Sequence, residues 1–155
     1  MQISADTIVL PAGAGTVIDV LGAPAVYKAS HESTGGRFSI FEQAIPAGYG
    51  VPPHRHAAED EAMYVLEGDI EIDGDAGAHR VGAGGFVFLP RGRFHSFRNA
   101  GPAPARALVI CTPGAALERC FREFEAAGRR GALAPAALAA IAAGHGVEIA
   151  PPPAA

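Results

Sequence analysis

Short apolar runs separated by Gly, Pro, Asp and Asn make up the chain from about Val17 to Cys111. Runs of this length and spacing predict an all-β sandwich or barrel. The segment Asp69–Asp73 alternates strictly between polar and apolar residues, which is the pattern of a half-buried strand. The expected strands are Val17–Leu21, Ala25–Ala29, Arg37–Ile45, Ala62–Glu67, Asp69–Asp73, Phe86–Leu89, Ser96–Arg98 and Arg106–Cys111.

Glycines between these runs predict the tight turns. Asp73-Gly74-Asp75 and Gly82-Ala83-Gly84-Gly85 supply positions that tolerate a positive φ. Aromatic side chains on the expected strands are predicted to lie in the core, and some of them to line an apolar pocket; they are Tyr64, Phe86, Phe88, Phe94 and Phe97.

The pattern changes after Pro113. Apolar residues then recur with the i, i+3, i+4, i+7 spacing of one helical face, at Leu117, Cys120, Phe121 and Phe124. Gly128 is placed to end this helix, and Pro135 opens a second short helix that runs to Ala143. We expect both helices to pack on the outside of the barrel as structural elements.

These patterns together predict one domain over residues 1–155. The barrel core covers about 17–111, the helical extension about 113–144, and the tail 151–155, rich in proline and alanine, is expected to be disordered.

Composition narrows the class of protein. Only 18% of the residues are charged and 49% are apolar, so the surface is sparsely charged and a subunit interface is plausible. The net charge is −4 and no basic stripe occurs, which argues against nucleic acid as the main partner. No apolar run reaches the roughly 18–20 residues of a membrane span, and no signal peptide is recognisable at the N-terminus. Cys111 and Cys120 are predicted to be reduced and partly buried, and the setting to be cytoplasmic.

Two spaced clusters carry the candidate chemistry. The first is Gly48-x5-His54-x-His56-x4-Glu61-x6-Gly68, and the second is Gly84-x5-Pro90-x-Gly92-x2-His95-x3-Asn99. On a strand, side chains at i and i+2 share a face, so the first two imidazoles can reach one point. Three nitrogen donors and one oxygen donor form a first coordination shell for one divalent transition metal: iron, nickel, manganese, cobalt, copper or zinc.

The acidic donor is not settled by strand parity. Glu59, Asp60 and Glu61 are consecutive, and both faces of the following strand are apolar, so Asp60 remains a rival of Glu61. The other histidines, His31, His79 and His145, lie beside turn-type residues and are predicted to be solvated or capping.

Both clusters match the two sequence motifs of the cupin superfamily at every defining position. The resemblance implies a conical double-stranded β-helix, or jelly-roll barrel, with short C-terminal helices here and a homodimeric assembly. It implies His54, His56, Glu61 and His95 as metal ligands, because the seven-residue step from Glu61 to Gly68 is that of the motif.

A looser resemblance covers Thr34–Ser39, Tyr64–Gly68 and Pro90–His95, which are similar to the small, single-domain, quercetin 2,3-dioxygenase-like bacterial cupins. It implies a metal-dependent dioxygenase acting on a flavonol-like or other enolisable aromatic compound. Glu61 would accept the proton of a substrate hydroxyl, and dioxygen would add to the activated ring. Two alternatives use the same site: a redox-neutral isomerase, decarboxylase or cyclase, and a barrel that binds a small molecule without catalysis.

Overall fold

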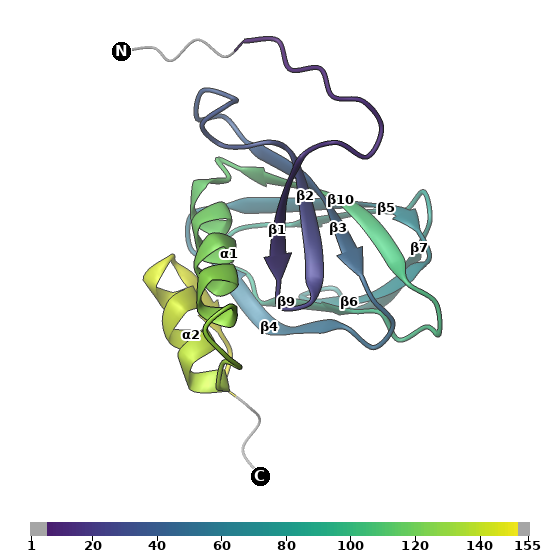
Figure 1. Cartoon of the computed structure of the whole chain (residues 1–155). Coiled ribbons are helices and arrows are strands. Elements are labelled where there is room, and N and C mark those ends of the chain that lie inside the picture. Colours follow the sequence, from purple (N-terminus) through teal and green to yellow (C-terminus); the bar gives the residue numbers. More distant parts are fainter. Residues whose placement is uncertain (1–5, 152–155) are drawn as a thin grey trace.

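Two antiparallel sheets pack face to face in the computed structural model, which describes residues 6–151 (Figure 1). The six-stranded sheet has the order β1-β2-β3-β10-β5-β8, and the five-stranded sheet has the order β11-β4-β9-β6-β7. The strands of the six-stranded sheet are β1 (Thr16–Val20), β2 (Ala23–Ala29), β3 (Ser39–Ile45), β5 (Asp60–Glu67), β8 (Phe86–Leu89) and β10 (Ala105–Thr112). Those of the other sheet are β4 (Gly50–His56), β6 (Asp69–Gly74), β7 (Gly77–Gly82), β9 (His95–Arg98) and β11 (Val147–Ile149).

The core lies between the sheets. Every second residue of β3 and of β10 is buried, as the two-residue period of a strand requires. Phe41, Met63 and Val109 are among the fully buried side chains that fill this space. The all-β class predicted from the sequence is therefore confirmed, and each of the eight expected strands is present.

The turn predicted at Asp73-Gly74-Asp75 is wrong by two residues. β6 continues through Gly74, and Asp75 and Ala76 form the turn that leads to Gly77, whose φ is 86°. In the second predicted turn only Gly84 has a positive φ, of 83°. The turn leads into β7, a strand that the sequence analysis did not predict.

Helices α1 (Ala115–Gly128) and α2 (Pro135–Gly144) confirm the two predicted helices. Both helices lie beside the two sheets, outside the strands (Figure 1). Leu117 and Cys120 on α1 are buried, and α1 contacts β1. Gly128 is the last helical residue, and Arg129 follows it as the cap. Within residues 6–151 neither helix is long and apolar enough to span a membrane.

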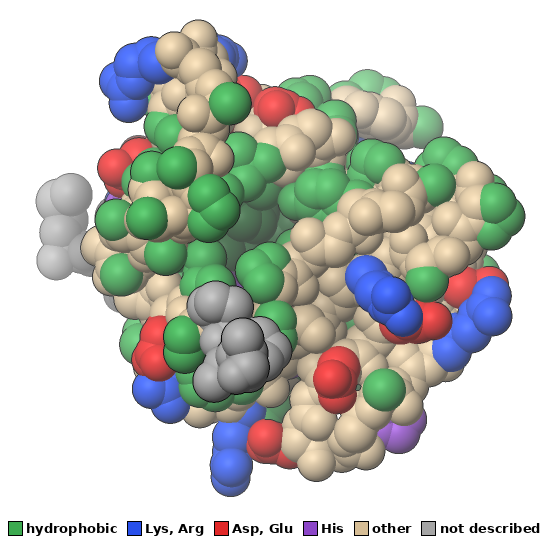
Figure 2. Space-filling model, turned by 90° about the horizontal axis from the view of Figure 1, so that it is seen from below, with side chains coloured by type: hydrophobic (Ala, Val, Ile, Leu, Met, Phe, Trp, Pro, Cys, Tyr) green, Lys and Arg blue, Asp and Glu red, His purple; other side chains and the backbone are tan. Residues whose placement is uncertain are grey.

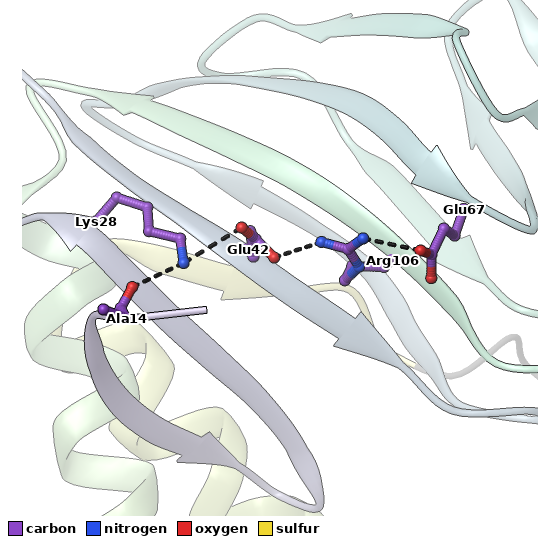
Figure 3. A network of polar contacts seen from close by, with 5 residues as sticks. All are labelled: Ala14, Lys28, Glu42, Glu67 and Arg106. Atoms are coloured by element: carbon purple, nitrogen blue, oxygen red, sulfur yellow. Dashed lines mark hydrogen bonds and ion pairs between the residues drawn. The ribbon is translucent and has the colours of Figure 1, made fainter. Parts of the chain in front are cut away.

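A line of charged side chains crosses the outer face of the six-stranded sheet (Figure 3). Glu42 on β3 pairs with Lys28 on β2 at 3.2 Å and with Arg106 on β10 at 2.5 Å. Arg106 also reaches Glu67 on β5 at 2.9 Å, while the Lys28 Nζ donates to the carbonyl oxygen of Ala14. These strand-surface charges pair with one another on the outer face of the sheet. The predicted tail residues 152–155 lie outside the described part of the chain.

Candidate metal centre

Four side chains that are distant in sequence converge inside the barrel. His54 and His56 on β4, Glu61 on β5 and His95 on β9 each contribute one donor atom, and these atoms lie within 4.8 Å of one another. All four residues are buried. The imidazole ring centroids are 4.4–5.5 Å apart. The histidines come from the five-stranded sheet and the glutamate from the six-stranded sheet.

A bulge in β4 aims the first two histidines. His54 lies opposite His95 in the β4–β9 pairing, and Val51 lies opposite Phe97, so β4 has one more residue than β9 between these two pairs. The additional residue falls at Pro52-Pro53, where neither proline can donate a ladder hydrogen bond. His54 and His56 then point inward, and Arg55 between them points outward to Glu148 on β11.

The loop that carries His95 is held from two sides. Gly92, with a φ of 76°, donates its backbone N–H to the carbonyl oxygen of His56. The Asp60 carboxylate accepts hydrogen bonds from Arg91 Nε at 3.1 Å and Nη2 at 2.6 Å. This guanidinium lowers the pKa of Asp60 to about 2. Asp60, the rival of Glu61, is therefore engaged outside the cluster, where it anchors the loop.

In two of the histidines, a hydrogen bond from Nδ1 to a backbone carbonyl oxygen leaves Nε2 facing the cluster. His54 Nδ1 donates to the Pro52 carbonyl oxygen at 2.9 Å, and His95 Nδ1 donates to that of Arg93 at 3.2 Å. Their Nε2 atoms are left without a proton and able to donate a lone pair. The Nε2 atoms of His56 and His95 are buried and make no well-aligned hydrogen bond, and Glu61 Oε2 lies 3.2 Å from the first and 3.6 Å from the second. Nitrogen and carboxylate atoms that are gathered this closely in a buried space fit a bound cation.

The electrostatics favour the protonation states that bind a metal. Burial lowers the pKa of His54 to about 4, so this imidazole is neutral near pH 7. Burial by itself would raise the pKa of Glu61, but the adjacent His56 and His95 imidazoles outweigh it and hold the pKa below its ordinary value. An ionised carboxylate and a neutral imidazole are the forms in which such groups bind a divalent ion. The donor set therefore fits a metal ion.

A cavity of about 290 Å³ opens onto His54 and Glu61. Its walls are largely apolar, and Figure 2 shows hydrophobic side chains around a hollow on this side of the molecule. Among the predicted strand aromatics, Phe97 lines this cavity. Tyr64, Phe86 and Phe88 are instead 45%, 64% and 57% exposed, so their predicted place in the core is wrong. They lie on the outer face because Met63 and Val65 take the inward positions of β5.

The remaining histidines lie away from the cluster. His31 and His79 bond backbone carbonyl oxygens of Pro113 and Ala76, and His145 lies 2.6 Å from Glu123. One important buried acid was missed from the sequence. Glu59 is 2% exposed, and its carboxylate accepts the backbone N–H groups at the start of α1.

Comparison with known proteins agrees with this geometry. The family model described as a cupin domain matches residues 41–111, which include all four donors. The chain folds as a cupin. Its fold and the matches together support placing it in the cupin superfamily.

One curated relative of this chain is an uncharacterised protein of Methanocaldococcus jannaschii, 28% identical over 64% of the chain and 74% of the relative. A solved sugar phosphate isomerase of Silicibacter pomeroyi is 26% identical with a TM-score of 0.53, and the match covers 60% of each chain. The polyketide cyclase RemF of Streptomyces resistomycificus is 25% identical with a TM-score of 0.54, over 65% of this chain and 70% of the cyclase. The names of the two solved proteins state different activities.

The cavity wall extends beyond the matched residues. Phe121 on α1, Leu138 on α2 and Ile149 on β11 all line the cavity, and all lie after residue 111. The sequence contained a signal for part of this wall, since the apolar face of α1 was recognised. The surface against which that face packs was not apparent from the sequence.

Proposed function

We propose that this cupin is a metal-dependent dioxygenase that acts on a small flavonol-like or other enolisable aromatic compound. The observation that carries the proposal is the buried cluster of three histidines and one glutamate at the end of a largely apolar cavity. His54, His56, Glu61 and His95 would hold a divalent transition metal, whose chemistry would be that of a Lewis acid toward an enolate or phenolate oxygen.

The side chains of the site have separate tasks in this proposal. Glu61 lines the cavity and is ionised, so it is placed to accept the proton of a substrate hydroxyl. His54 also faces the cavity, and its ring is fixed by the Pro52 carbonyl oxygen. Apolar walls hold an aromatic ring and exclude water from the reacting atoms. The substrate is oxidised and dioxygen is reduced, so no further reductant is required.

Two linked measurements test the proposal. Elemental mass spectrometry of the untagged protein should find about one equivalent of a redox-active metal or nickel, which is lost in His95→Ala. The metal-loaded protein is then incubated with a panel of flavonols in air and under strict anaerobiosis. Oxygen-dependent loss of a flavonol supports the proposal. No loss of any flavonol in air would count heavily against it.

A redox-neutral reaction at the same site is the second candidate, and the likeness to a polyketide cyclase favours it. Here Glu61 would move a proton on an enolisable substrate and no oxygen would be consumed. Product formation under strict anaerobiosis identifies this alternative, and zinc as the native metal would add weight to it. Tight binding without conversion under both conditions would indicate a small-molecule-binding barrel.

A further inference from the structure

We propose that the C-terminal extension, residues 115–149, restricts the cavity to uncharged substrates with an apolar body and excludes sugar phosphates. This inference rests on the proposed function in one respect, because it takes the histidine and glutamate cluster as the reactive end of the cavity. It concerns the rest of the substrate, which that cluster does not select.

Apart from an ion held by the cluster, the cavity offers no positive charge to a substrate. Among the described residues no Lys or Arg lines it, and Glu61 is its sole charged side chain. A phosphate or carboxylate taken out of water needs a cation or several N–H donors to replace its hydration. A phosphorylated sugar would find a cation only at the cluster, which the reacting oxygens of the substrate would occupy, and hydrocarbon along the walls.

The arginines nearest the cluster are directed elsewhere. Arg55, between His54 and His56, pairs with Glu148 at 2.6 Å. Arg91 pairs with Asp60, and Arg98 pairs with Glu71 on the surface of the five-stranded sheet. None of the three lines the cavity, so a charged substrate could not use them without breaking an ion pair.

The neutral polar side chains of the cavity are also engaged. The Tyr49 hydroxyl donates to the Val20 carbonyl oxygen at 3.2 Å. Gln43 Nε2 donates to the carbonyl oxygens of Ala23 and Ala44, at 2.9 and 3.0 Å. These side-chain donors serve the backbone, so they are not available to sugar hydroxyls. Recognition away from the cluster therefore depends on apolar contact.

The extension supplies much of that contact. Phe121 lines the cavity and packs edge-on against the buried Phe41, with ring centroids 5.7 Å apart. Leu117, Phe124, Leu138 and Ile149 continue the same wall. The volume of about 290 Å³ lies at the small end of ligand cavities. It suits a compact ring system that carries neighbouring oxygens toward the cluster.

The inference is tested by isothermal titration calorimetry, which measures the affinity of the zinc-loaded protein for two probes, naphthalene-2,3-diol and glucose 6-phosphate. The diol should bind at least about tenfold more tightly than the sugar phosphate, a difference of about 1.4 kcal/mol. Phe121→Ala should weaken diol binding several-fold without changing the zinc stoichiometry. Val17→Ala is the control, because this side chain is 59% exposed and does not line the cavity.

The outcomes separate this inference from the proposed function. Selective diol binding without turnover of any flavonol would contradict the dioxygenase and leave the inference intact. Absence of diol binding, or sugar phosphate binding of equal strength, overturns the inference whatever the enzyme catalyses. So does an unchanged diol affinity in Phe121→Ala. If that variant does not fold, Leu138→Ala on α2 provides the same test from a second wall residue.

Discussion

His54 and His95 are oriented by main-chain atoms two residues earlier in their own strands or loops, at Pro52 and Arg93. A carboxylate in this position would add a charge to the site, whereas a carbonyl oxygen fixes the ring without one. No side-chain substitution removes a carbonyl oxygen. The orientation of these two rings should therefore survive most changes to their neighbours.

Removal of one donor should weaken metal binding strongly. In His54→Ala we expect at least the roughly ten- to hundredfold loss of affinity that substitutions in the outer shell of metal sites already cause. Competition with a chelating dye measures the affinity. His79→Ala is the control, since His79 is exposed and bonded to Ala76. Equal metal affinity in the two variants would mean that His54 is not a ligand.

The two thiols should be inert in the folded protein. Burial raises the pKa of Cys120 to about 12 and raises that of Cys111 well above its ordinary value. At pH 8 only about one Cys120 in ten thousand would be ionised, and the thiolate is the reactive form. Ellman's reagent should label neither cysteine within minutes, and both after denaturation. Rapid labelling of one thiol, abolished in Cys120→Ser, would instead indicate that the wall formed by α1 opens.

At the scale of elements, α1 depends on a glutamate from another part of the chain. Gly114 precedes the helix and has no side chain with which to cap it. The Glu59 carboxylate fills this role by accepting the N–H groups of Ala116 at 2.7 Å and Leu117 at 2.9 Å. Since Glu59 lies two residues before Glu61, the same turn leads into the metal centre and fixes one wall of the cavity.

Loss of this cap should destabilise the fold. In Glu59→Ala we expect the free energy of unfolding to fall by about 1–3 kcal/mol, because two buried N–H groups lose their acceptor and the helix terminus loses a favourable charge. Urea denaturation followed by circular dichroism measures the change. Glu32→Ala, at an exposed glutamate in the loop after β2, should change stability little. Equal effects in both variants would argue against the capping role.

The elements that could be predicted are those with one buried face, because such a face gives a periodic pattern of apolar residues in the sequence. β6 alternates and was found, whereas β7, from Gly77 to Gly82, has no buried face and hence no alternation. β11 has three residues, too few for a pattern to be recognised. The spacing of the two motifs also allowed the four donors to be predicted, because each donor lies beside the strand or turn that positions it.

What depends on distant packing could not be predicted in this way. Glu59 accepts hydrogen bonds from Ala116 and Leu117, which follow it in the sequence by 57 and 58 positions. No local pattern marks a contact over such a separation. Phe121 meets Phe41 from the opposite half of the chain. Strand parity left Asp60 and Glu61 equivalent. In the structure Glu61 lies on the buried face of β5, whereas Asp60 lies on the other face and pairs with Arg91.

At the scale of the molecule, exposed apolar side chains gather on one face. Eight large hydrophobic residues are exposed among residues 6–151, and three of these are the aromatics Tyr64, Phe86 and Phe88 on β5 and β8. Three more, residues 8–10, belong to the N-terminal segment. That segment lies beside Lys28 and Glu42, on the outer face of the same six-stranded sheet that carries the aromatics. Exposed apolar surface of this kind favours association of two copies.

We therefore expect the protein to be a dimer of about twice 15.8 kDa in solution. The double variant Phe86→Ser, Phe88→Ser should shift the mass measured by light scattering toward the monomer. Val17→Ser is the control, because Val17 is similarly exposed but lies on β1 at the opposite edge of the sheet. A monomeric wild-type protein at high concentration would contradict the expectation.

The division of the four donors between two sheets has a consequence for the lifetime of the fold. Glu61 belongs to the six-stranded sheet and the three histidines belong to the other, so an ion bound by all four would join the sheets at their centre. The sheets could not separate until at least one bond to the ion broke. Unfolding of the loaded protein would then be limited by the rate of metal release, and a chelator would shorten the survival of the native state in denaturant even where the equilibrium is not reached.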